Sequence, residues 1–337
     1  MLFFPSHDIA LGNGVRHFNP PAAALALQED LSWLAEIWNE GLVSPLPWGW
    51  DWDTRQSLHR DYRIPLSSLP TDVQLEQIRQ LSSRQSSIHI LKALNYQGPM
   101  PEYICNADTL DDYIRRMDDN DQPFVLKTPW SSSGRGLIRS QVTPRTLMQQ
   151  RAMAAIRRMG GIMAEPWLDK LQDFAMLFFV GSERVSFLGY SLFDSDSNGT
   201  YRHGYLMSND DIRHRICHHD GIEDNGLLSQ LTDLEQSLCN ILTDMFAPFF
   251  GHGWQLGYVG IDMMSYRPSS SINEQRPSIC ENGQAFINPC VEMNLRCTMG
   301  VVSRLWSDRN LKAGENGLFT ISPLGDDGHF QAQFKIL

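Results

Sequence analysis

Residues 123–142 read PFVLKTPWSSSGRGLIRSQV, and our interpretation of the chain starts from this stretch. Phe124–Lys127 predicts a short apolar strand, and Leu137–Val142 predicts a second one. Between them lies a loop of small residues, Ser131-Ser132-Ser133-Gly134-Arg135-Gly136. Glycine and serine let backbone N–H groups approach an anion closely. The stretch therefore predicts a flexible hairpin that closes over phosphate groups, with Lys127 as a fixed cation. An ordinary surface hairpin is the simpler alternative.

Two further segments carry oxygen ligands. One is Gly260-Ile261-Asp262, and the other is Val291-Glu292-Met293-Asn294-Leu295-Arg296. Alternation along a strand places Glu292, Asn294 and Arg296 on one face. Carboxylate and amide oxygens suit Mg²⁺, and the fork of an arginine suits a phosphate or a carboxylate. A simple surface ion pair between Glu292 and Arg296 is the alternative, but apolar neighbours make an exposed strand face unusual.

The rest of the chain predicts helices alternating with short strands. Helical patterns cover 22–38, 71–81, 86–94, 108–117, 143–158 and 227–246, and strand patterns cover 163–168, 174–180, 185–192, 258–265 and 285–293. This alternation favours α/β or α+β layers.

Together these segments resemble the ATP-grasp superfamily, in particular its members that are similar to D-alanine–D-alanine ligase. The matching features are the strand that ends at Lys127, the Ser/Gly loop, the Gly-Ile-Asp strand and the Glu-x-Asn-x-Arg segment. A fifth is Glu165-Pro166-Trp167-Leu168, followed by Asp173. The five occur in the expected order, and the resemblance covers residues 84–305.

The resemblance implies how ATP would be held. Lys127 would contact the α-phosphate side, and the loop Ser131–Gly136 would close over the β- and γ-phosphates. Adenine would be held by Glu165 and by the backbone near Trp167 and Leu168. Asp173 would hold the ribose, where the family usually has a glutamate.

It also implies a metal and a catalytic arginine. Asp262, Glu292 and Asn294 would bind one or two Mg²⁺ ions that bridge the phosphates. Arg296, together with Lys127, would stabilise the transferring phosphoryl group. A second basic ATP contact is expected at Arg84, with Lys92 as the alternative.

The implied fold is α+β, with two lobes that clamp the nucleotide. We expect an α/β N-terminal domain over 1–85 and an ATP-grasp domain over 86–337, with lobes at about 86–180 and 181–337. Residues 266–283 are longer than the family's compact hairpin and are expected to form a surface loop or a hairpin extension that either covers the site or is peripheral to it. The segment 1–83 carries no substrate signature. Residues 193–205 predict a polar loop beside the substrate, where Arg202 or His203 could bind a carboxylate; solvated loop residues are an equally good interpretation of both.

The implied function is an ATP- and Mg²⁺-dependent ligase that joins a carboxylate to an amine or similar nucleophile through an acyl phosphate. Two alternatives remain open: a phosphotransferase, and a non-catalytic nucleotide-binding protein. The sequence names neither substrate and leaves the oligomeric state open.

Composition and charge limit the partners and the cellular location that we expect. The 337 residues carry a formal net charge of −11, which disfavours a nucleic-acid partner. The longest apolar run, Phe174–Val180, is far too short to span a bilayer, and the first residues do not resemble a signal peptide. Six cysteines without a CxxC pair fit a reducing compartment, so we expect a cytoplasmic protein. The spacing of His214 and His218 beside Cys217 could bind zinc, although a solvated helix face is the simpler interpretation.

Overall fold

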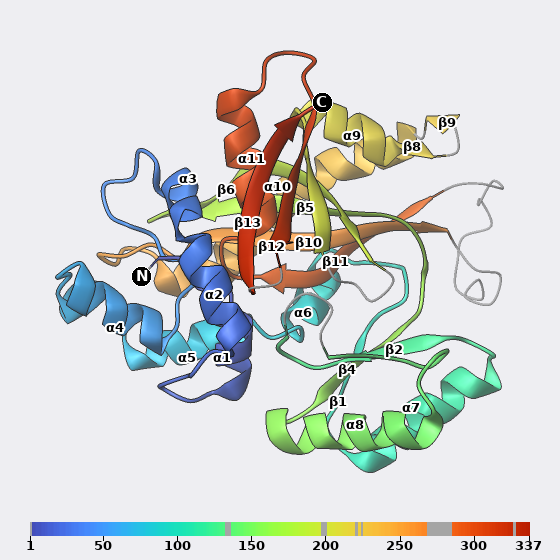
Figure 1. The fold of residues 1–337 in the computed structure, drawn as a ribbon. Helices are drawn as coiled ribbons and strands as arrows, with labels where there is room; N and C mark the ends of the chain where they lie inside the picture. Colours follow the sequence, from blue (N-terminus) through green and yellow to red (C-terminus); the bar gives the residue numbers. More distant parts are fainter. Residues whose placement is uncertain are drawn as a thin grey trace.

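Figure 1 shows the fold, taken from a computed structural model that describes residues 2–131, 136–196, 201–219, 222–223, 225–267, 285–325 and 328–337. Helices and antiparallel sheets are both present, so the predicted α+β class is confirmed. A small four-stranded sheet and a larger seven-stranded sheet form two separate layers in this part of the chain. The gap between these layers positions the candidate site.

The small lobe is built on the strand that the sequence predicts at Phe124–Lys127. Its strands are β1 (Glu102–Ile104), β2 (Phe124–Lys127), β3 (Leu137–Arg139) and β4 (Ile162–Pro166), in the order β1-β4-β2-β3. Helices α7 (Ala107–Asp119) and α8 (Arg145–Met159) lie on one face of this sheet (Figure 1). Their apolar stripes bury Leu110, Ile114 and Ile156 against Leu126, which gives the lobe its own core.

The large sheet is antiparallel, with strand order β11-β10-β5-β6-β7-β12-β13. Its strands are β5 (Asp169–Val180), β6 (Val185–Ser195), β7 (Tyr201–Leu206), β10 (Gly257–Arg267), β11 (Phe286–Asn294), β12 (Gly317–Leu324) and β13 (His329–Ile336). The predicted strands over 174–180, 185–192, 258–265 and 285–293 are confirmed, each with small differences at its ends. The polar segment 193–205 continues two of these strands in its described part, because Phe193 pairs with Gly204 across β6 and β7.

Helices cover both faces of the large sheet. One face packs against α10 (Asn225–Phe246) and α9 (Asn209–Cys217), with the short strands β8 (His218–His219) and β9 (Ile222–Glu223) beside them and η3 (Ala247–Phe249) after α10. The other face packs against α11 (Met299–Asn310) and the first helices of the chain. Buried side chains on α11, such as Val301 and Val302, meet Leu177 of β5 and Leu206 of β7 in this second core. None of the helices in the described ranges is long and apolar enough to cross a membrane.

The N-terminal segment differs from the prediction. Its elements are α1 (His7–Asn13), α2 (Ala22–Asp30), η1 (Ser32–Leu34), α3 (Ala35–Asn39), α4 (Trp52–Asp61), η2 (Leu66–Ser68), α5 (Asp72–Leu81) and, from residue 86, α6 (Ser86–Ala93). Residues 2–85 form helices and no strand, so the expected α/β character of this segment was wrong. Its buried tryptophans, Trp38 and Trp48, pack into the core of the large sheet beside Leu177 and Tyr258.

The helix predicted over 22–38 is also interrupted. It ends at Asp30, turns through η1 and resumes as α3. The hydroxyl of Ser32 donates a hydrogen bond to the carbonyl of Glu29 at 3.0 Å, which competes with regular helical bonding at this point. Leu34 and Trp38 are both buried on either side of this break.

Candidate active site

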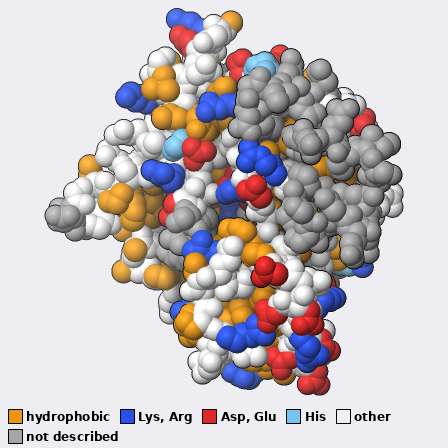
Figure 2. All heavy atoms as spheres, turned by 90° about the vertical axis from the view of Figure 1, so that its right-hand side faces the viewer, with side chains coloured by type: hydrophobic (Ala, Val, Ile, Leu, Met, Phe, Trp, Pro, Cys, Tyr) orange, Lys and Arg blue, Asp and Glu red, His pale blue; other side chains and the backbone are white. Residues whose placement is uncertain are grey.

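A cavity of about 880 Å³ lies between the two sheets and is lined by residues of both lobes. Figure 2 views the molecule from the right-hand side of Figure 1 and shows basic and acidic side chains close together around a hollow in this face. Most of the site residues expected from the sequence line this cavity, namely Arg84, Lys127, Ser131, Glu165, Trp167, Leu168, Asp173, Asp262, Glu292, Asn294 and Arg296.

The small-lobe wall of the cavity carries an ion pair. Lys127 ends β2, and Glu165 lies on the neighbouring strand β4. Val125 is directly opposite Glu165 in the antiparallel register, so Lys127, two residues further on, shares a face with that glutamate. The Lys127 Nζ and Glu165 Oε1 atoms are 2.8 Å apart, and both side chains are largely buried.

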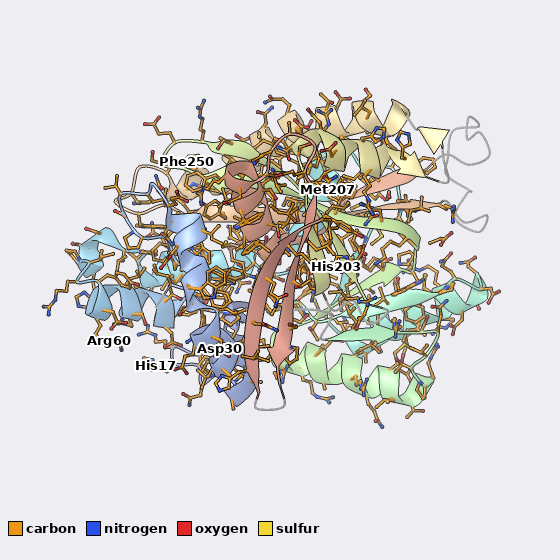
Figure 3. The ribbon with its side chains drawn as sticks, turned by 45° about the horizontal axis from the view of Figure 1, so that its top comes forward. His17, Asp30, Arg60, His203, Met207 and Phe250 are labelled. Atoms are coloured by element: carbon orange, nitrogen blue, oxygen red, sulfur yellow. The ribbon has the colours of Figure 1, made fainter. Side chains whose placement is uncertain are left out.

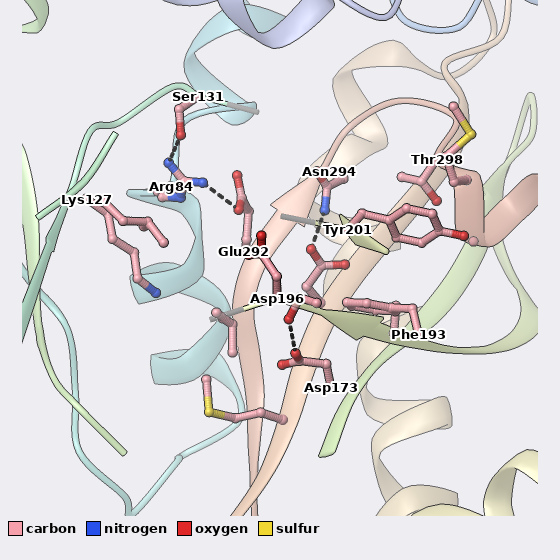
Figure 4. Close-up of a pocket in the computed structure, with 18 of the residues that line it drawn as sticks. Arg84, Lys127, Ser131, Asp173, Phe193, Asp196, Tyr201, Glu292, Asn294 and Thr298 are labelled. Atoms are coloured by element: carbon pink, nitrogen blue, oxygen red, sulfur yellow. Dashed lines mark hydrogen bonds and ion pairs between the residues drawn. The ribbon is translucent and has the colours of Figure 1, made fainter. Parts of the chain in front are cut away.

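Arg84 connects the small lobe to the large sheet. It lies in the turn between α5 and α6, where its backbone N–H donates to the carbonyl of Pro129 at 2.9 Å. Its guanidinium donates to the Thr128 carbonyl and the Ser131 hydroxyl, and to the Glu292 carboxylate from the other side, each at 2.7 Å (Figure 4). The arginine is 5% exposed and lines the cavity, whereas the alternative candidate, Lys92, is exposed on α6.

The large-sheet wall brings three oxygen-bearing side chains together. Asp262 on β10 is directly opposite Glu292 on β11, and Gly260 is opposite Asn294. The register shifts just before this point, where Pro289 lies within β11; a proline is tolerated at such a bulge because no ladder hydrogen bond is lost. The Asn294 amide donates to Asp262 at 2.9 Å, so the three side chains predicted to bind metal are neighbours.

This wall concentrates negative charge. Burial, with the charge of Glu292 beside it, raises the pKa of Asp262 from 3.8 to about 7. Two carboxylates directly opposite each other on one face are unfavourable unless a cation lies close. Arg84 supplies one positive charge to Glu292, and Asp262 receives an amide hydrogen bond instead. These oxygen ligands therefore suit a divalent cation, because Mg²⁺ prefers carboxylate and amide oxygens whose negative charge is not already neutralised.

Arg296 is held by a carboxylate from the other end of the chain. Its guanidinium lies against Asp8 of α1, with Nε 2.9 Å from both carboxylate oxygens and Nη2 2.7 Å from one of them. Nη2 also donates to the side-chain oxygen of Asn294 at 3.0 Å. Burial would raise the pKa of Asp8, but the charge and hydrogen bonding of Arg296, with smaller contributions from His7 and Arg84, together lower it. The sequence analysis missed Asp8, because nothing in the sequence connects two residues 288 positions apart.

The remaining predicted residues lie around the small-lobe end of the cavity. Trp167 is 37% exposed, and the guanidinium of Arg139 lies 5.8 Å from its ring centroid. Asp173 on β5 accepts a hydrogen bond of 2.6 Å from the Ser195 hydroxyl and pairs with Lys170. Lys170 and Ser195 were not predicted, although Lys170 lies only three residues before Asp173.

Several expectations fall elsewhere. Ser132, Ser133, Gly134 and Arg135 lie outside the described residues, as does most of the 266–283 segment. His203 pairs with Asp194, at 3.2 Å, and Arg202 is exposed. Within the described ranges, no three His, Cys, Asp or Glu side chains are grouped to hold a metal ion, so the zinc interpretation of His214 gains no support and the candidate Mg²⁺ site consists of two carboxylates and one amide.

Comparison with known proteins finds solved structures that are similar to this chain but assigns it to no family. No protein-family profile matches the sequence, and no curated protein does. Among solved structures, similar ones are a biotin carboxylase from Campylobacter jejuni (TM-score 0.46, 9% identity, 81% of this chain and 58% of that one) and N5-carboxyaminoimidazole synthetase from Staphylococcus aureus complexed with ADP (0.42, 10%, 73% and 57%). Another is D-alanyl-alanine synthetase A from Vibrio cholerae (0.42, 10%, 71% and 63%). The chain spans less than two thirds of each of these chains, and likeness at this level does not establish a family.

Proposed function

We propose that the chain is an ATP-grasp enzyme that binds Mg·ATP in the cavity and ligates a carboxylate to an amine or similar nucleophile. The observation that carries the proposal is the pairing of two charged walls across one cavity. Lys127 and Glu165 lie on the small lobe, and Asp262, Glu292 and Asn294 lie on the large sheet. Fixed charges on two separate lobes can hold a polyphosphate between them.

The nucleotide would lie against the small lobe. Lys127 is the cation for the phosphates, and Ser131 marks the start of the loop proposed to cover them. The side chains of Val125 and Leu137 line the cavity close to Trp167 and Leu168, which supplies an apolar surface for adenine. Asp173, which already contacts Lys170 and Ser195, would bind the ribose hydroxyls.

The metal would lie against the large sheet. Asp262, Glu292 and the amide oxygen of Asn294 would hold Mg²⁺, although Glu292 would have to be shared with Arg84 and Asn294 with Arg296. When bound, Mg²⁺ supplies charge neutralisation on the phosphates.

The chain's own groups would do the remaining work. Arg296, fixed by Asp8, offers a positive charge beside Asn294 where negative charge develops during phosphoryl transfer to the carboxylate. The walls of the cavity would exclude water, which would otherwise hydrolyse the acyl phosphate before the amine attacks. Carbon–nitrogen bond formation is our preferred outcome, because an amine is the nucleophile that the resemblance implies. The five described cysteines are free, which supports the predicted cytoplasmic setting.

The test is a screen of carboxylic acids, with amines and amino acids as nucleophiles, for release of ADP and free phosphate. A ligase gives both products in equal amounts with a condensed product. ADP without free phosphate indicates a phosphotransferase. Tight binding of Mg·ATP without turnover of any compound in the screen indicates a nucleotide-binding protein without catalysis. Absence of Mg·ATP binding contradicts the proposal.

A further inference from the structure

The cavity extends well past the charged walls. In Figure 4, Phe193, Tyr201 and Thr298 lie on the opposite side of Glu292 and Asn294 from Lys127. We call this half the apolar chamber. It is lined by half-buried side chains from both ends of the chain and from β6, including Ile9, Ala24, Leu27, Phe193, Ile321 and Phe330. Apolar surface facing a cavity is a source of binding energy when a ligand covers it.

The outer wall of the chamber is held in place by specific contacts. Asp30, at the end of α2, accepts hydrogen bonds from the backbone N–H of Phe330 at 2.7 Å and from the His329 ring at 3.0 Å. Figure 3 labels Asp30 beside the C-terminal hairpin of β12 and β13. Leu27 and Phe330 therefore belong to one fixed surface, although they are separated by most of the chain.

Two buried serines that line the cavity have unused polar groups. Ser6 is 1% exposed and Ser191 is 3% exposed; both line the cavity, and neither hydroxyl has a hydrogen-bond partner in the described part of the chain. A buried hydroxyl without a partner is costly, so a ligand that supplies one is favoured.

The first turn of α11 lies beside Ser191 and lines the same cavity as Ser6. Thr298, Met299 and Gly300 line the cavity, and the Thr298 side chain caps the helix by accepting from the Val301 N–H. The N–H groups of the first turn have no acceptor within the helix, and the helix dipole adds partial positive charge there. A Cβ atom on Gly300 would lie 2.7 Å from the Ser191 hydroxyl, so glycine keeps this hydroxyl next to the helix end. The polar end of the chamber therefore suits an anion.

We propose that the apolar chamber binds a carboxylic acid that carries a branched aliphatic or aromatic group. Its carboxylate lies at the first turn of α11 with Ser6 and Ser191, and its apolar group lies against Ala24, Leu27 and Phe330. The proposal rests on the proposed function, for which it names the acid substrate. The first turn of α11 begins two residues after Arg296. A carboxylate there would lie on the side of the cavity where the phosphoryl group would be transferred.

The experiment measures acid binding without nucleotide. Calorimetry compares 3-phenylpropanoate, phenylalanine, leucine, alanine and glycine on the wild-type protein. We expect the compounds with large apolar groups to bind at least tenfold more tightly than glycine, because only they cover the chamber walls. The first two compounds distinguish a simple acid from an amino acid. Equal affinity across the panel, or no binding by any member, overturns the proposal.

Two variants localise the binding. Ala24→Phe fills the chamber and should weaken phenylalanine and leucine at least tenfold. The matched control, Leu25→Phe, changes the neighbouring side chain, which is 46% exposed, and should leave the affinity unchanged. If Ala24→Phe unfolds, Phe330→Ala enlarges the chamber instead and should reduce the preference for leucine over alanine. If neither variant changes the affinities, the ligand does not bind in the chamber.

Mg·ATP binding on the same samples separates this proposal from the proposed function. Apolar acids that bind while Mg·ATP does not would refute the proposed function and leave the chamber as a binding site. Mg·ATP binding without preference for apolar acids would refute the chamber proposal alone.

Discussion

The two walls of the cavity carry similar polar groups but neutralise them in different ways. On the small-lobe wall, Lys127 and Glu165 lie on adjacent strands and balance each other directly. On the large-sheet wall, Asp262 and Glu292 face one another, and the arginines beside them depend on residues far away in the sequence. The first wall is therefore complete within one lobe, whereas the second depends on the N-terminal segment and, in our proposal, on a metal ion.

The largest expected effect concerns the distant support of the second wall. Asp8→Asn removes the carboxylate that pairs directly with the buried Arg296, and breaking such a pair typically costs about 3–5 kcal/mol of unfolding free energy. Urea unfolding measures the change. Asp112→Asn is the control, because the ion pair between Asp112 and Arg115 is exposed to solvent. Its loss should cost at most about 0.5 kcal/mol of unfolding free energy. Equal stabilities of the two variants would show that the second wall does not depend on Asp8.

The next effect tests the self-contained wall. Lys127→Ala removes the proposed phosphate cation and should weaken Mg·ATP binding about 10–100-fold, since hydrogen bonds to charged groups contribute about 1.5–3 kcal/mol. Calorimetry with Mg·ATP gives the affinity, with Lys92→Ala as the control at an exposed lysine. A Lys127→Ala protein that binds as tightly as wild type would place the phosphates elsewhere.

A smaller change is expected from the metal-facing wall. Glu292→Gln keeps the shape but removes one anionic ligand, so the Mg²⁺ concentration needed for half-maximal turnover should rise about tenfold. The readout is ADP release across a Mg²⁺ titration, with Glu102→Gln on the outer strand β1 as the control. An unaltered Mg²⁺ dependence would show that Glu292 is not a metal ligand, so neither wall would need a metal ion to balance its charges.

The last prediction is a pH dependence of stability in the absence of metal. The native pKa of Asp262 is about 7, above its ordinary 3.8, so the native state binds this proton more tightly than the unfolded state. Stability from this group is complete below pH 4 and is lost as the pH rises to about 7. Asp262→Asn lacks the effect. Unfolding in EDTA at several pH values should show wild type losing stability relative to the variant, and a constant difference would contradict the raised pKa.

Local patterns in the sequence predicted much of the fold. The apolar run Phe124–Lys127 and the alternation through Glu292 and Asn294 identified their strands, because each pattern reflects burial on a single sheet face. The N-terminal α/β prediction was wrong because it came from the family resemblance. Trp38 and Trp48 of that segment are buried against the large sheet, and this burial has no periodic signature.

The candidate site likewise contains residues that the sequence could predict and contacts that it could not. Asp262, Glu292 and Asn294 could be placed together because strand geometry is regular. The partners of the arginines could not be predicted, since Arg296 bonds to Asp8 and Arg84 bonds to Glu292 across long stretches of chain. Such pairs depend on tertiary packing, which a single sequence does not display.

The attachment of Phe330 to Asp30 has a consequence for biosynthesis. The cavity uses Asp8 near the beginning of the sequence and Phe330 near its last residues, so no nascent chain shorter than about 330 residues can complete it. The small lobe, with all of its strands between residues 102 and 166, can fold on the ribosome long before that. Ligand binding should therefore require synthesis past residue 330, and a ribosome-stalled chain ending before β12 would bind no apolar acid even though its small lobe is folded.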